Sequence, residues 1–161
     1  MAARLPEPAA IKKLWVDLLG RGVTVEKAAE PMKVERPNPE AYTALYVTKA
    51  RTVPTIISCD RTLAAHGAAA LALLPPDQAR GWINAGALSA EAAENFHEIL
   101  NIMAATLNEV NLRSHVKLSA VLPPGKAVPT PITVVDKPVA RLDLVIDIDG
   151  YASGRMSILT I

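Results

Sequence analysis

The amino-acid sequence predicts an α+β domain in which long helices pack on a mainly antiparallel sheet. Three observations support this class. Apolar residues recur every three or four positions near the N-terminus and again over residues 90–110, which is typical of amphipathic helices. Short runs rich in β-branched residues follow one another without an intervening helix. The last run alternates apolar with acidic residues, and the overall order argues against a doubly wound α/β fold.

The composition is that of one globular domain, predicted to span residues 1–161. Half of the 161 residues are apolar and 20% are charged. The formal net charge is +1, from 17 basic and 16 acidic residues, and no basic surplus or basic cluster is evident. This argues against nucleic-acid binding, and the lack of a Lys/Arg-rich helix face argues against a membrane-surface role.

The sequence shows no targeting or membrane-spanning segment. The stretch MAARLPEPAAIKK lacks the uninterrupted apolar core of a signal peptide, and the most apolar run, Leu63–Leu74, is too short to cross a bilayer. The single cysteine, Cys59, lies in an apolar run, so we expect a buried thiol and no intrachain disulfide. A soluble, cytoplasmic protein is expected.

The N-terminal segment is predicted to begin with a helix. The helix starts at Ala9, and Gly20 and Gly22 end it. A second, short helix is expected over Val25–Met32, followed by a proline-rich loop over residues 33–40. The apolar positions of the first helix follow the spacing i, i+3, i+4, i+7 and i+8: Ile11, Leu14, Trp15, Leu18 and Leu19.

Two strands and a helix are predicted next. Tyr42–Cys59 holds two runs of β-forming residues. Asp60 is suited to cap a helix over Thr62–Leu74, which Pro75 ends. We interpret Pro76–Ala87 as a connecting stretch.

The C-terminal part is predicted to return to strands. A strand is expected around Val116–Val121, and an edge strand around Ile132–Val135 is an alternative to a proline-rich loop. The segment ARLDLVIDIDG (140–150) alternates apolar and acidic residues as a half-buried strand does. After a turn, RMSILTI (155–161) forms the second strand of a closing hairpin.

The longest predicted helix is Ala90–Val110, with Ser89 as its N-cap. On a helical wheel two opposite stripes appear. The stripe predicted to be buried contains Phe96, Ile99, Leu100, Met103, Leu107 and Val110. The stripe predicted to face solvent contains Glu94, Glu98, Asn101, Ala105 and Asn108.

Glu98 and Asn101 form the candidate functional pair on this exposed stripe, one helical turn apart. A carboxylate accepts hydrogen bonds or pairs with a lysine, whereas a carboxamide both donates and accepts and can orient a water molecule without titrating. Water orientation of this kind is used in phosphoryl transfer. The spacing alone does not distinguish such a pair from an ordinary solvated helix face.

The segment ENFHEILNIMAATLNE (94–109) resembles the Glu-x-x-Asn signature helix of the CheC/CheX/FliY family of chemotaxis phosphatases. The resemblance extends over most of the chain, including VPTIISCDRTLAAHGAAALALL (53–74) and the closing ARLDLVIDIDGYASGRMSILTI (140–161). Because only one such motif is present, the chain looks like CheX rather than CheC. The resemblance therefore implies a CheX-like fold, with the long helix lying on the sheet.

The resemblance also implies an activity, the hydrolysis of the aspartyl phosphate on a CheY-type response regulator. Asn101 would orient the attacking water, and Glu98 would engage the lysine of the regulator. No metal or other cofactor of this chain is implied, since the partner receiver domain would carry the Mg²⁺. The residues expected to contact the partner around the catalytic pair are Glu94, His97, Ala105 and Asn108.

A non-catalytic module that binds or scaffolds a partner is the alternative function. Family members often carry Gly-Asn where this chain has Ala105-Thr106, and the added methyl group would hinder close docking. The resemblance also suggests a homodimer, formed through an edge strand of the closing sheet. A small-molecule-binding domain has no supporting motif.

No other cluster of side chains predicts a site. Asp143, Asp147 and Asp149 alternate along a strand and are expected to form a solvated face rather than a metal loop. The three histidines lack the spacing of metal ligands: His66, His97 and His115. The sequence therefore predicts no metal site.

Overall fold

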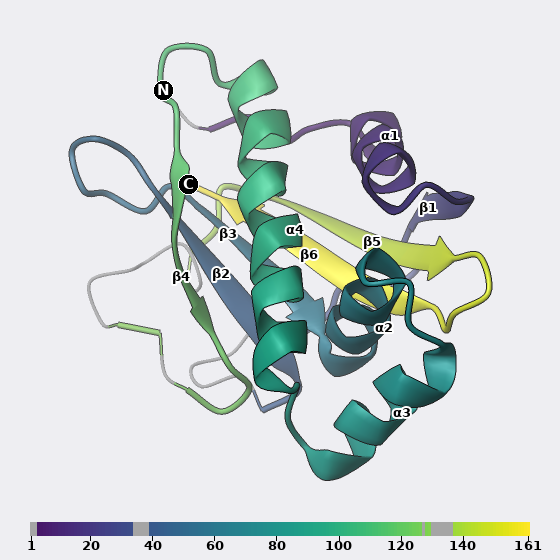
Figure 1. The fold of residues 1–161 in the computed structure, drawn as a ribbon. Coiled ribbons are helices and arrows are strands. Elements are labelled where there is room, and N and C mark those ends of the chain that lie inside the picture. The colour runs from purple at the N-terminus through teal and green to yellow at the C-terminus, as the bar shows by residue number, and fades with distance from the viewer. Residues whose placement is uncertain (1–2, 34–38, 127, 130–136) are drawn as a thin grey trace.

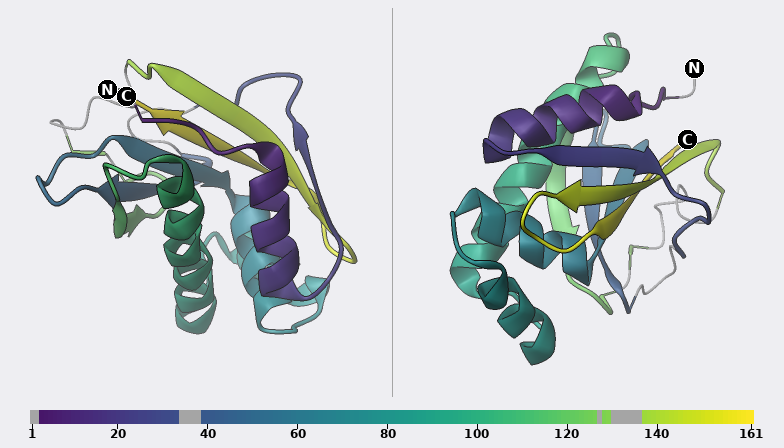
Figure 2. Two further views of the ribbon diagram at one scale, coloured as in Figure 1. Left: turned by 90° about the horizontal axis from the view of Figure 1, so that it is seen from above. Right: turned by 90° about the vertical axis from the view of Figure 1, so that its right-hand side faces the viewer.

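The computed structural model describes residues 3–33, 39–126, 128–129 and 137–161. Within these residues, four helices lie on one face of a six-stranded sheet with the strand order β1-β5-β6-β3-β2-β4 (Figure 1). Every neighbouring pair of strands is antiparallel. Seen from above in Figure 2, the helices gather below the sheet. The predicted α+β class with a mainly antiparallel sheet is confirmed.

The N-terminal helix α1 (Pro8–Leu19) ends as predicted, because Gly20 adopts the left-handed conformation with φ of 65°. The predicted short helix over Val25–Met32 is wrong. The chain forms strand β1 (Val23–Lys27) there, and it pairs antiparallel with β5. The weak helical pattern is overridden because β1 buries Val23 and completes hydrogen bonds along the β5 edge.

Strands β2 (Ala41–Val47) and β3 (Thr55–Asp60) are the two strands predicted in this region, and they pair with each other. Asp60 caps helix α2 (Arg61–Leu71), since its side chain accepts a hydrogen bond from the Leu63 amide at 2.8 Å. The helix stops three residues before the predicted end at Leu74.

Helix α3 (Pro76–Ala85) corrects the prediction of a connecting stretch over Pro76–Ala87. Pro76 occupies the first turn, where its missing amide hydrogen is not needed. The helix buries Ala79 and Trp82. Helix α4 (Ala90–Val110) has the predicted bounds, and the Ser89 hydroxyl accepts a hydrogen bond from the Ala92 amide.

The remaining strands are β4 (Lys117–Leu122), β5 (Ala140–Ile148) and β6 (Gly154–Thr160). The last two form the predicted hairpin. The hairpin occupies interior positions of the sheet, so it supplies no edge for pairing with a second copy; β1 and β4 are the outer strands among those that the structure describes. The predicted edge strand over residues 132–135 lies outside the described residues.

The sheet is apolar on both faces. The larger core lies between the helices and the sheet, and the smaller one lies on the face without helices. The smaller core is formed by five buried residues: Leu45, Ile56, Leu122, Val128 and Leu159. The helix-free face is therefore built to be covered by chain segments rather than left fully to solvent.

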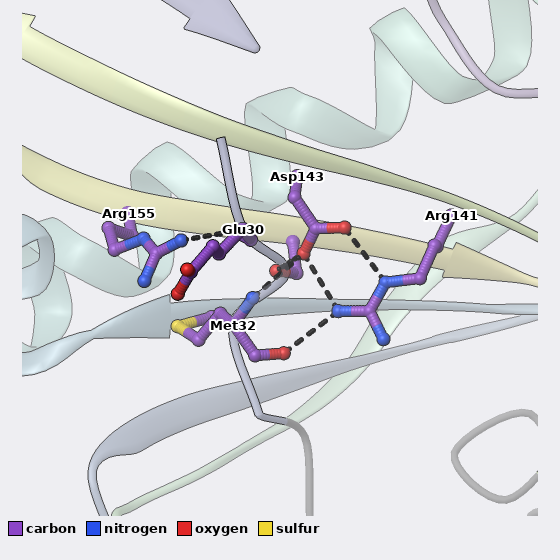
Figure 3. A network of polar contacts seen from close by, with 6 residues as sticks. Glu30, Met32, Arg141, Asp143 and Arg155 are labelled. Atoms are coloured by element: carbon purple, nitrogen blue, oxygen red, sulfur yellow. Dashed lines mark hydrogen bonds and ion pairs between the residues drawn. The ribbon is translucent and has the colours of Figure 1, made fainter. Parts of the chain in front are cut away.

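Asp143 anchors one such segment, which follows β1 (Figure 3). Its carboxylate accepts hydrogen bonds from Arg141, from the Ser157 hydroxyl at 2.5 Å and from the Met32 amide at 3.2 Å. Arg141 also donates to the Met32 carbonyl oxygen at 2.8 Å. The expectation that Asp143 belongs to a solvated strand face is wrong, because its side chain is only 13% exposed and ties residue 32 to the sheet.

We expect the Asp143→Asn variant to lose stability in a pH-dependent way. Desolvation raises the pKa of this carboxyl, but the bonds from Arg141, Ser157 and Met32 outweigh it, so its pKa lies below the ordinary value. Because the folded-state pKa is depressed, the ionised carboxylate stabilises the fold at pH values above the unfolded-state pKa of about 3.9. This stabilisation is lost as the pH falls through the folded-state pKa. Urea unfolding should show a deficit of about 1–2 kcal/mol at pH 7 that shrinks below about pH 4.

Asp147→Asn is the matched control for this prediction. Asp147 is exposed on the same strand, and its carboxylate forms no hydrogen bond with any described residue. Its replacement should leave the free energy of unfolding within about 0.5 kcal/mol of wild type. An Asp143→Asn deficit that is equal at pH 7 and pH 3 would contradict the account.

Candidate functional site

Helix α4 carries the candidate site and lies along the sheet beside α2 (Figure 1). Its inner side is buried as the helical wheel predicts, although Val110 is only half-buried. The buried residues of the helix are Ala92, Phe96, Ile99, Leu100, Met103, Ala104, Thr106 and Leu107. A long apolar contact of this kind fixes which face of the helix reaches solvent.

Polar contacts hold α4 in place along its length. The hydroxyl of the buried Tyr46 donates a hydrogen bond to the Leu100 carbonyl oxygen at 2.6 Å, directly beside Asn101 in the chain. Near the C-terminal end, Asn108 donates to the Val116 carbonyl at 2.9 Å and accepts from the Val116 amide at 2.8 Å. The helix is therefore a fixed platform, which precise placement of a catalytic group requires.

The outer face of α4 exposes Glu98 and Asn101, the candidate catalytic pair. Glu94, His97 and Ala105 are also exposed on this face. Asn108 is half-buried, and both polar atoms of its side-chain amide are used within the fold. The structure thus brings five of the predicted site residues together on one solvent-facing surface, and their roles toward a partner stay predictions.

The surface of α4 is acidic. The helix contains Glu91, Glu94, Glu98 and Glu109, all exposed, and no lysine or arginine. Neither Glu94 nor Glu98 forms an ion pair with any residue that the structure describes. Uncompensated carboxylates on a fixed helix favour association with a surface that presents a cation.

Ala105 and Thr106 differ in what they contribute to this surface. The Thr106 side chain is only 4% exposed, so it is not part of the exposed face of α4. Ala105 is exposed on the same face as Asn101. Of the two departures from the Gly-Asn pattern, only the added methyl group of Ala105 therefore bears on docking.

The other titratable candidates have structural roles. His66 is buried, its Nδ1 accepts a hydrogen bond from the Ala152 amide at 3.4 Å, and its ring meets Tyr151 edge-on. Burial and then the charge of Arg80 lower the pKa of His66, which favours the neutral ring. Cys59 is fully buried, and burial raises the pKa of its thiol well above the ordinary value. A buried, protonated thiol is not a nucleophile.

Among the residues that the structure places, no group of three or more His, Cys, Asp or Glu side chains could hold a metal ion. None of the helices in the described ranges combines the length and the apolar character needed to cross a membrane.

Comparison with solved structures finds the same fold in FliM middle domains and in the chemotaxis protein CheX. The FliM middle domain from H. pylori matches with a TM-score of 0.65 and 14% identity, covering 95% of this chain and 84% of that chain. A FliG–FliM complex from H. pylori matches at 0.62 with 13% identity and coverage of 95% and 85%. A CheX–CheY complex with BeF3 and Mg²⁺ from Borrelia burgdorferi matches at 0.56 with 12% identity, covering 93% and 92%.

Sequence comparison adds no relative, since no family model and no curated protein matches the chain. The structural matches, which also include CheC-like and FliY proteins, show that the chain has a CheC/CheX/FliY-type fold. The fold predicted from the Glu98/Asn101 helix and its flanking segments is therefore confirmed. Sequence identities this low show a shared fold and do not show a shared activity.

Proposed function

We propose that this chain binds a phosphorylated CheY-type receiver domain through the exposed face of α4 and accelerates hydrolysis of its aspartyl phosphate. The observation that carries the proposal is the exposure of Glu98 and Asn101, one turn apart, on a helix held by the Tyr46–Leu100 hydrogen bond. The CheX–CheY complex supports the proposal, since it pairs a protein of this fold with CheY.

In the proposed reaction, Asn101 positions the attacking water. Its side-chain oxygen accepts a hydrogen bond from the water, and its amide group can donate to a phosphoryl oxygen. The water oxygen forms a bond to phosphorus, the bond between phosphorus and the aspartyl oxygen breaks, and inorganic phosphate and a free carboxylate result. Such a reaction depends on positioning and on charge stabilisation, so no nucleophile of this chain is needed.

Glu98 has a different proposed role, that of orienting the two proteins. Its carboxylate would pair with the lysine of the receiver site, and the neighbouring acidic residues on α4 would favour approach of a basic surface. The Mg²⁺ would belong to the receiver domain, as no metal-binding role is proposed for this chain.

A non-catalytic binding module is the second candidate. The exposed methyl group of Ala105 favours it, because this group lies on the surface where the receiver would have to approach Asn101 closely. FliM, a protein of the same fold, is seen in complexes with FliG and with SpeE. On this alternative, the chain would bind a receiver or another partner without changing the lifetime of the phosphate.

A kinetic experiment separates the two candidates. Receiver domains from the source genome would be phosphorylated with acetyl phosphate, and inorganic phosphate release would be followed with and without this protein. Complex formation would be measured in parallel with the beryllofluoride-activated receivers. Faster release supports the phosphatase, binding without faster release supports the binding module, and neither binding nor release would overturn both.

Enlarging Ala105 is expected to weaken receiver binding selectively. The Ala105→Leu side chain would point to solvent, so the free energy of unfolding should change by less than about 0.5 kcal/mol. The added bulk should raise the Kd for the activated receiver by about tenfold or more, because it separates the docking surfaces. Ala93→Leu, at an exposed position of α4 off the Glu94–Ala105 stripe, is the control and should leave the Kd unchanged.

A further inference from the structure

We propose a second docking site, on the helix-free face of the sheet, that takes an acidic, partly apolar segment of a partner protein. The site is a groove of about 1010 Å³ formed by β2, β4 and the turn between β2 and β3, with Lys126 and Pro129 completing its wall. It lies away from the exposed face of α4, so the proposal does not depend on the phosphatase activity.

The floor of the groove is apolar. Leu45 and Leu122 belong to the smaller core on the helix-free face, and Val53 and Ala120 pack against that core. Val47 continues this floor toward the turn. Apolar side chains of a partner would therefore find an apolar surface already assembled there.

The rim of the groove is basic. Lys49, Arg51, Lys117 and Lys126 line it, together with His115, and none of the lining residues that the structure describes is acidic. The two segments that supply most of the groove, residues 41–59 and 110–129, contain no Asp or Glu. None of the four Lys and Arg side chains forms an ion pair with a described residue, so their charge is available to a partner.

The turn that carries Arg51 is conformationally unusual. Arg51 has a φ of 62°, in the left-handed region that residues other than glycine seldom adopt. The turn is held by a hydrogen bond from the Thr48 amide to the Thr52 carbonyl at 2.9 Å and by a contact of 2.8 Å between their hydroxyls. The turn therefore holds the Arg51 side chain at the rim of the groove at a cost in backbone strain that glycine would not incur.

The chemistry of the groove favours an acidic peptide over other anions. Among the described residues, no aromatic side chain lines the groove, so these residues offer no stacking platform of the kind a single-stranded nucleic-acid site uses. A β-bulge near Leu45 and Tyr46 interrupts the β2–β4 pairing, and Lys117 lies on the edge strand. Both features disfavour simple strand addition at the β4 edge, so the partner is expected to lie over the sheet face.

The test uses fluorescence anisotropy with a short fluorescein-labelled peptide in which Glu and Leu residues are separated by Ser. We expect binding that weakens with added salt. A peptide with Lys in place of Glu, and one with Ser in place of Leu, should bind at least about tenfold more weakly. Lys49→Glu and Lys117→Glu should each weaken binding similarly, whereas Lys27→Glu on β1, at the opposite sheet edge, should not.

The Arg51→Gly variant separates a binding role from a structural one. Relief of the left-handed conformation should raise the Tm while peptide binding weakens. Leu73→Gly is the matched control, because Leu73 has a φ of 58° but lies outside the groove, and it should raise the Tm without changing binding. Absence of peptide binding, an equal loss with Lys27→Glu, or tighter binding of single-stranded RNA or phosphatidylserine vesicles would overturn the proposal.

Discussion

Replacing Asn101 with alanine is expected to lower the rate of receiver dephosphorylation by about 10²-fold, because the attacking water loses the group that orients it. The side chain is exposed and forms no hydrogen bond within the described residues, so the fold should be unaffected. The Kd for the beryllofluoride-activated receiver should rise by about fivefold at most, because docking loses no more than one hydrogen bond from the carboxamide. Phosphate release and binding are measured on the same preparation.

Two further variants make this prediction specific. Glu98→Gln should instead raise the Kd, because the neutral side chain no longer pairs with the lysine of the receiver. Asn84→Ala removes an exposed asparagine from α3 and should change neither quantity. If Asn101→Ala dephosphorylates the receiver as fast as wild type, the proposed role of Asn101 is wrong.

Replacing Gly154 with alanine is expected to have the largest effect on stability. A Cβ atom at Gly154 would lie 2.4 Å from the Cβ of Leu63 and 2.6 Å from its Cα and backbone nitrogen. Leu63 is in the first turn of α2, where its amide is bonded to the Asp60 cap, so the backbone cannot move aside locally. Displacing α2 from the sheet should cost about 3 kcal/mol or more in the free energy of unfolding.

Gly81→Ala is the control for this substitution. Gly81 lies in α3, and nothing lies within 4 Å of the position that its Cβ would take. Alanine should therefore stabilise the helix by about 0.5–1 kcal/mol, because glycine is unfavourable in a helix interior. Urea unfolding monitored by circular dichroism tests both variants. An unchanged midpoint for Gly154→Ala would show that the contact between α2 and β6 is looser than described.

Local sequence signals were sufficient where an element carries its own ends and a strong period. Helix α4 has a serine cap, a long apolar stripe and an outer stripe of polar residues, and both its bounds and its orientation were predicted correctly. Strand β1 and helix α3 were predicted wrongly. Both are short. Strand β1 is determined by its pairing with β5, which is distant in sequence, and α3 by its packing on α2, the helix just before it in the chain.

The candidate site, like the fold, was predictable only where local sequence signals determine it. The wheel placed Glu98 and Asn101 on the solvent side, but it could not show that the Asn108 side chain is bonded to Val116 beyond the helix. The basic groove was not predicted, because the net charge of +1 sums over the whole chain and does not show where the charged side chains lie in the fold. Its cations come from segments around Lys49 and Lys117, which only the β2–β4 pairing brings together.

The central claim, that the outer face of α4 receives the phosphorylation site of a receiver domain, is tested most directly by NMR chemical-shift mapping. Isotope-labelled protein would be titrated with the unlabelled, beryllofluoride-activated receiver. We predict the largest shifts for amides between Glu94 and Ala105 and for the side-chain amide of Asn101. Binding that shifts resonances on other faces while leaving this stretch of α4 unchanged would contradict the account.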